Sequence, residues 1–101
     1  MPKEYTITTP VFPDGITVCV KQKEYQNGNL AVLLSAPDGE PIFKASTNTE
    51  LKLDSPLFVC KNYNENEGLD IALEIAGIAQ RTGDTVRVGY ATCPIMELLE
   101  D

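Results

Sequence analysis

The sequence predicts an α+β fold: an antiparallel β-meander sheet of about four or five strands with one long helix packed on a face. Short segments in which apolar and polar residues alternate indicate strands, Pro, Asp, Asn and Gly clusters between them indicate turns, and residues 65–82 have a helical pattern. The 101 residues, 43% hydrophobic and 23% charged, are typical of one globular unit. We therefore expect a single domain over residues 1–101.

The N-terminal strands are predicted from alternation and turn chemistry. Residues 5–9 are expected to form an edge strand, and Pro13-Asp14-Gly15 a turn. In residues 16–21 apolar positions alternate with polar ones, which is typical of a sheet with one face toward the core. Asn27-Gly28 lies between two such segments, and this pair is a strong hairpin signal because both residues tolerate positive φ. The same alternation places Lys21 and Lys23 on the solvent face of the strand.

The next segments complete a meander. Residues 30–36 form a continuous apolar run, which favours a central strand buried on both faces. Residues 37–40 are predicted to turn, and residues 41–47 to form the third antiparallel strand, because Pro41 is suited only to the start of a strand. Residues 57–60 and 85–91 are two further short strand candidates.

The helix predicted over residues 65–82 has a narrow polar stripe. Asp70, Glu74, Gly77 and Arg81 follow one another at steps of 4, 3 and 4, so a period of 3.6 residues places them on one face. Both carboxylates are expected to face solvent, where nothing desolvates them.

The remaining circumference of the predicted helix is apolar. We therefore expect part of Ile71, Ile75 and Ile78 to be covered, either in a homodimer interface or by residues 51–57 or the C-terminal tail.

The ends of this helix carry start and stop signals. Asn64 is the expected N-cap, with Glu67 three residues later as its capping-box partner. Arg81 lies in the expected last turn and Gly83 just beyond it, where a residue with positive φ ends many helices.

Charge and composition exclude several classes of partner. With 15 acidic and 8 basic residues the net charge is −7, which repels phosphate backbones and anionic lipids. No apolar run approaches the ~20 residues of a membrane span. Cys19, Cys60 and Cys93 have no paired spacing and are expected to be free thiols. We therefore expect a cytoplasmic protein with no direct nucleic-acid or membrane partner.

Signatures of catalysis and of cofactor binding are missing from the sequence. It contains no histidine, which removes the commonest general base and zinc ligand. The glycines do not form a phosphate-binding motif. The carboxylate pairs Asp38 with Glu40 and Asp70 with Glu74 have structural explanations, in a turn and on a helix surface. The sequence predicts no enzyme, no metal site and no cofactor.

One segment has an unbalanced charge. Residues 62–80 carry four acids and no basic residue. Two of the acids are explained by the positive end of the helix dipole. The four candidates for a partner-binding surface are Glu65, Glu67, Asp70 and Glu74.

Three short motifs lie from Tyr25 onward, and an acidic-capped apolar helix separates the second from the third: Tyr25-Gln26-Asn27-Gly28-Asn29-Leu30-Ala31, Asp38-Gly39-Glu40-Pro41 and Thr92-Cys93-Pro94. In this order they resemble a family of unknown function, whose members are small single-domain proteins carried by phages and conjugative elements of gut bacteria. The resemblance implies no activity. It implies an accessory protein of a mobile genetic element, a class that often acts by binding a host or defence protein.

Three function classes follow. The first is a non-enzymatic accessory protein that acts through protein-protein contacts, with a protein partner and a possible homodimer. The second is an acidic inhibitor that mimics nucleic acid on a basic site of a host or defence protein. An enzyme that works with carboxylates alone is the third.

Overall fold

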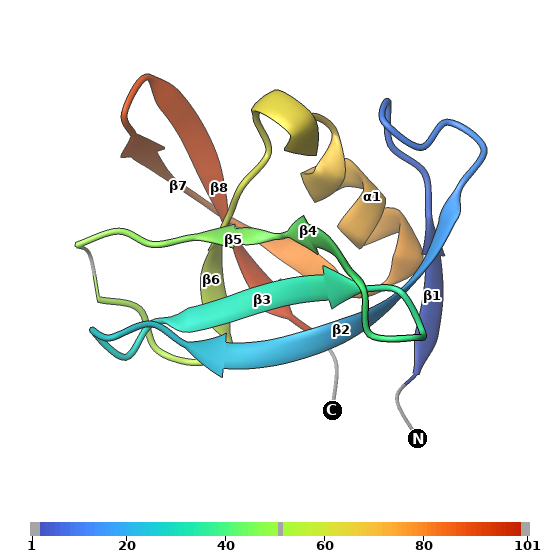
Figure 1. Ribbon diagram of the computed structural model, residues 1–101. Coiled ribbons are helices and arrows are strands. Elements are labelled where there is room, and N and C mark those ends of the chain that lie inside the picture. The colour runs from blue at the N-terminus through green and yellow to red at the C-terminus, as the bar shows by residue number, and fades with distance from the viewer. Residues whose placement is uncertain (1–2, 51, 100–101) are drawn as a thin grey trace.

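The computed structural model describes residues 3–50 and 52–99, which form two four-stranded antiparallel sheets and one α-helix (Figure 1). The strand orders are β1-β2-β3-β4 and β5-β6-β8-β7. The α+β class is confirmed, but the single sheet was wrong. The elements are β1 (Glu4–Ile7), β2 (Ile16–Glu24), β3 (Leu30–Ser35), β4 (Pro41–Lys44), β5 (Ser46–Thr47), β6 (Leu57–Cys60), the 3₁₀ turn η1 (Asn64–Asn66), α1 (Leu69–Ala76), β7 (Ala79–Val88) and β8 (Ala91–Leu98).

The first sheet is the predicted meander. The Asn27-Gly28 turn joins β2 to β3; Gly28 has φ 88°, and its N–H donates to the Tyr25 carbonyl at 2.9 Å. β3 lies between β2 and β4, as the apolar run indicated. Its even-numbered residues, such as Val32 and Leu34, enter the core, because a strand points successive side chains to opposite faces.

The chain leaves the first sheet at Ala45, between β4 and β5. The Ala45 N–H donates to the Val32 carbonyl in β3 at 2.9 Å, whereas its carbonyl accepts from the Lys61 N–H just after β6 at 2.8 Å. Ala45 is completely buried. The predicted third strand over residues 41–47 is therefore two strands, because the backbone of Ala45 is bonded toward both sheets.

The helix is much shorter than predicted. α1 ends where Gly77 adopts φ 77°, and the Ile78 N–H then closes the end on the Leu73 carbonyl at 3.0 Å. A left-handed residue at this position ends an α-helix. From Ala79 onward the chain forms β7 and pairs with β8, so tertiary pairing overrides a helical pattern that continued to Thr82.

The predicted helix caps were wrong as well. Asn64 lies in η1 with φ 56°, and Gly68, with φ 79°, is the residue before α1. No side-chain hydrogen bond caps α1, so Glu67 does not act as a capping-box partner. Gly83, the expected stop, lies inside β7 where its register with β8 shifts.

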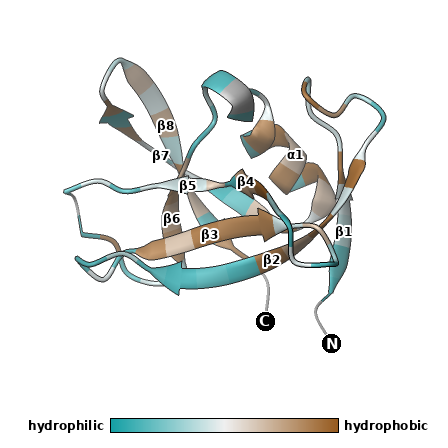
Figure 2. Cartoon of the chain, viewed as in Figure 1, coloured by the Kyte–Doolittle hydropathy of each residue, from teal (hydrophilic) through white to brown (hydrophobic). Residues whose placement is uncertain are grey.

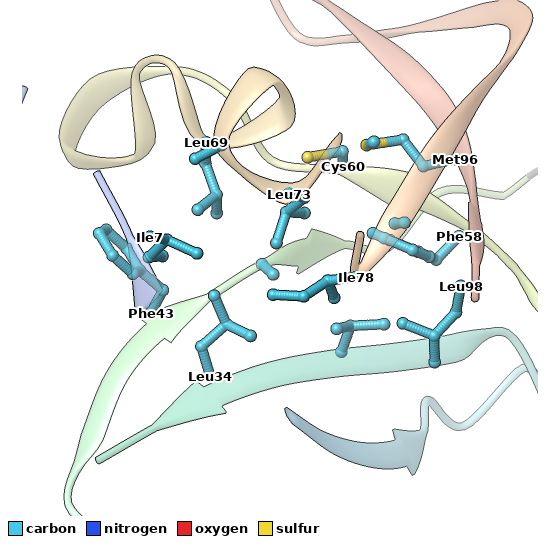
Figure 3. Close-up of a cluster of buried hydrophobic side chains, with 14 of the residues drawn as sticks. Ile7, Leu34, Phe43, Phe58, Cys60, Leu69, Leu73, Ile78, Met96 and Leu98 are labelled. Carbon is cyan, nitrogen blue, oxygen red and sulfur yellow. The ribbon is translucent and has the colours of Figure 1, made fainter. Parts of the chain in front are cut away.

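The main core lies between α1 and the two sheets (Figure 3). Leu69 and Leu73 of α1 are fully buried, and Ile78 lies at the end of the helix among side chains from both sheets. The other labelled side chains of this cluster are Ile7, Leu34, Phe43, Phe58, Cys60, Met96 and Leu98. The three cysteines are free and buried, as expected.

Candidate functional site

The predicted polar stripe is assembled, but from two elements rather than one helix. Arg81 projects from β7 back to α1. Its Nη2 lies 2.5 Å from Asp70 Oδ2, and its Nη1 forms an ion pair with Glu74 Oε1. The Arg81 backbone N–H also donates to Glu74 Oε2 at 3.0 Å. Helical spacing thus grouped the right residues for an incorrect reason.

Asp70 does not face solvent. It is only 7% exposed, so the expectation that nothing desolvates this carboxylate was wrong. The side chains of Glu74 and Arg81 are 33% and 39% exposed. Arg81 therefore neutralises the acids of α1 at the boundary between core and solvent.

This ion-pair cluster also affects ionisable groups beneath it. The hydrogen bond from Arg81 to Asp70 raises the pKa of the guanidinium, against the opposing effect of desolvation. Burial, reinforced by the charge of Asp70, raises the pKa of the Cys60 thiol far above its usual 9.0. Burial likewise raises the pKa of Cys93. Both thiols stay neutral at physiological pH and are poor nucleophiles.

The four predicted partner-binding residues do not share one environment. Asp70 and Glu74 are paired with Arg81. Glu67 is exposed between η1 and α1. Glu65 belongs to η1, and its side chain falls outside the described part of the structure. Of the four, Glu67 is therefore the acid shown in open contact with solvent.

The outer stripe of α1 is apolar and uncovered. Ile71 is 53% exposed and Ile75 is 83% exposed, whereas Ile78 is completely buried in the core. Ile71 and Ile75 are one helical turn apart and lie on the same face. Leu51 and residues 100–101, which belong to the segments expected to cover them, lie outside the described residues. The homodimer remains a prediction.

A second surface was missed by sequence reasoning. Lys21, Lys23 and Lys44 line a hollow of about 230 Å³ over β2, β3 and β4. Ser35 also lines the hollow, and its buried hydroxyl has no hydrogen-bond partner among the described residues. Alternation identified Lys21 and Lys23 as surface residues, but only the register of β3 with β4 brings Lys44 beside them.

Comparisons with protein-family models, curated proteins and solved structures found no match to this chain. The resemblance to a mobile-element family therefore stays a prediction. Among residues 3–50 and 52–99, no group of three or more His, Cys, Asp or Glu side chains could hold a metal ion. No helix in the same part of the chain is long and apolar enough to cross a membrane. Asp38 accepts a hydrogen bond from the Glu40 N–H at 3.0 Å, which agrees with the structural explanation for that pair.

Proposed function

We propose that this protein is a non-enzymatic binding module that contacts a protein partner through the outer stripe of α1, Ile71 and Ile75. The observation that supports this proposal is the 83% exposure of the Ile75 side chain on a helix whose opposite face is buried. Two large aliphatic side chains at i and i+4 are the anchors used when a helix docks into an apolar groove. The resemblance to mobile-element proteins supports a role as an accessory protein that binds a host protein.

The charge around this stripe favours apolar contact over nucleic-acid mimicry. A mimic needs free carboxylates in a regular array, but Asp70 and Glu74 are already paired with Arg81. Burying paired charges at the rim of an interface costs less than burying unpaired ones. Glu67 is exposed and can attract basic residues of the partner at the edge of the contact. These observations support the first function class more strongly than the acidic inhibitor.

The test is a paired capture experiment from extracts of the native host. The variant Ile71→Ser with Ile75→Ser should lose the partner that wild type retains, with affinity lowered at least ~10-fold. The matched control is Tyr90→Ser with Leu99→Ser, which removes two exposed apolar side chains outside α1. The control should bind like wild type. Equal binding by all three proteins would reject the stripe as the contact surface.

Two further measurements separate the alternatives. Glu67→Lys should weaken binding only slightly if contact is apolar, and strongly if charge dominates. Reversing Asp70 and Glu74 is unsuitable, because two lysines would oppose Arg81 and disturb the fold. Light scattering of the pure protein then tests whether the partner is a second copy of this chain. If so, wild type should be a dimer and the double isoleucine variant a monomer.

A further inference from the structure

The outer face of the β2–β3–β4 sheet has an ordered pattern of charge. Lys21 pairs with Leu33, and Leu33 pairs in turn with Lys44, so these residues form a row across three strands. In antiparallel sheets this spacing places the Cα atoms of the two lysines roughly 10 Å apart. Lys23 lies on the same face two residues beyond Lys21, roughly 7 Å along the strand. Figure 2 shows the hydrophilic second half of β2 beside the hydrophobic β3.

In the described part of the chain, these lysines are not engaged in ion pairs. The chain carries only 8 basic against 15 acidic residues, yet three of the basic ones line this single hollow and no acid does. None of the three forms an ion pair within residues 3–50 and 52–99. Lys44 instead lies over the Tyr25 ring, with Nζ 5.5 Å from its centroid. Acids line two neighbouring hollows instead: Asp38 lines one that shares Lys21, and Glu24 lines one that shares Lys23.

The hollow also has an apolar floor and one unsatisfied polar group. Leu33 and Ile42 are partly buried and contribute to the apolar lining, together with Leu34, Pro41 and Phe43. Ser35 is only 3% exposed, and its hydroxyl has no hydrogen-bond partner in the described structure. An unpaired buried hydroxyl destabilises the folded protein, because it has lost its hydrogen bonds to water without replacement. A ligand that supplies the missing partner recovers part of that cost.

We propose that this face, formed by Lys21, Lys23, Lys44, Leu33, Ile42 and Ser35, binds an extended peptide segment in which acidic residues flank an apolar one. Three lysines that line the same hollow as apolar side chains match several carboxylates on either side of an apolar side chain. A fatty acid, with one carboxylate, satisfies fewer of them. In an extended segment alternate residues are roughly 7 Å apart on one face, so two acids that flank an apolar residue are roughly 14 Å apart. This is close to the diagonal separation of Lys23 and Lys44, whose Cα atoms are roughly 12 Å apart across the three strands. Lys21, Leu33 and Lys44 lie on the side of the sheet opposite Val32 and Leu34, whereas Ile42 also packs against the main core. No residue of the site belongs to the α1 stripe.

The probe is the peptide acetyl-Glu-Ser-Phe-Ser-Glu-amide, titrated into isotope-labelled full-length protein and followed by amide chemical shifts. Saturable shifts should concentrate in β2, β3 and β4 and weaken as salt rises from about 50 to 300 mM, because exposed charges are screened. Peptides with Ser in place of Phe, or Gln in place of both Glu residues, should each bind several-fold more weakly. Binding that is equal for the Phe and Ser peptides would reject the apolar floor and overturn the proposal.

Matched lysine variants test the location. Lys21→Glu with Lys44→Glu should weaken binding about 10-fold, because two exposed charge pairs with the peptide are lost. Lys3→Glu with Lys52→Glu alters the net charge equally, from −7 to −11 at two units per substitution, and should leave affinity within about 2-fold. If both variants lost the same affinity for the peptide, the acidic peptide would be attracted to positive charge anywhere on the protein. That result would overturn the proposal.

Ser35→Ala supplies a variant that keeps the charge. It should raise the melting temperature of the free protein and weaken the peptide about 2- to 10-fold. Dodecanoate is the competing probe. If dodecanoate bound saturably on this face and the peptide caused no chemical-shift changes, the ligand would be a small amphiphile and not a peptide. That result would overturn the proposal.

Discussion

At the scale of single residues, Arg81 joins two elements through ion pairs. It comes from β7, reaches α1 and forms ion pairs with Asp70 and Glu74. The two pairs are unequal, because the Asp70 side chain is 11% exposed and that of Glu74 is 33% exposed. A buried carboxylate loses more than an exposed one when its cation is removed, since water cannot replace the lost partner.

We therefore expect Arg81→Met to lower the free energy of unfolding by about 2 kcal/mol, below the full cost of a buried pair because Arg81 is itself partly exposed. Glu74→Gln is the control and should cost less than ~0.5 kcal/mol. Urea denaturation of the three proteins measures both values. Equal effects of the two substitutions would contradict the buried role of Asp70.

Cys60 gives a second prediction, for alkaline pH. In the folded protein burial holds the pKa of its thiol far above 9.0, whereas the unfolded chain releases the proton near that value. The stabilisation is complete below pH 9 and declines as pH rises, because only the unfolded state ionises. Between pH 9 and 10 the free energy of unfolding should fall about 1 kcal/mol more in wild type than in Cys60→Ala. Parallel pH profiles would refute this.

At the scale of elements, the end of α1 decides the fold of the second sheet. Gly77 has φ 77°, and an added Cβ there would meet no atom within 4 Å. The residue is thus required for its backbone conformation and not for space. If Gly77 continued the helix, Ala79 and Gln80 could not pair with Leu98 and Glu97 of β8.

Gly77→Val should accordingly destabilise the protein by about 1–2 kcal/mol, the cost of a β-branched residue in the left-handed region. Gly77→Asn should cost much less, because Asn tolerates this conformation. Thermal unfolding followed by circular dichroism compares the two. A Val variant as stable as the Asn variant would show that the backbone can relax at this position.

The local features of the fold were predictable from the sequence, and the non-local ones were not. The Asn27-Gly28 hairpin and the central position of β3 depend on neighbouring residues only. The helix end was missed because Gly77 fits the periodic pattern of an uninterrupted helix, and its left-handed conformation is stabilised by the pairing of β7 with β8. Spacing grouped Asp70 and Arg81, but the burial of Asp70 depends on how β7 packs against α1.

At the scale of the whole molecule, Ala45 couples the two sheets. One of its backbone groups is bonded to Val32 of β3, and the other to Lys61 after β6. The Ser46 hydroxyl adds a second connection, since it accepts from the Val32 N–H at 2.9 Å. Side chains from both sheets also share the main core.

The sheets should therefore unfold in one transition. Ala45→Pro removes the N–H that bonds Val32 and should lower the free energy of unfolding by about 3 kcal/mol, while Ala45→Gly, which keeps the N–H, should cost about 1 kcal/mol. Far-ultraviolet circular dichroism and tyrosine fluorescence should give coincident curves for every variant. Two separated transitions would contradict the coupling.

The position of Ala45 also has a consequence for protection from solvent exchange. Opening either side of this junction breaks the hydrogen bond between Ala45 and Val32 or the one between Lys61 and Ala45. We therefore expect local fluctuations to expose these two amides rarely. Their hydrogens should exchange only through global unfolding, at a common slow rate. Tyr90, at the tip of the β7–β8 hairpin, is fully exposed, and the amides near it should exchange orders of magnitude faster. The junction would then be among the last parts of the native protein to open.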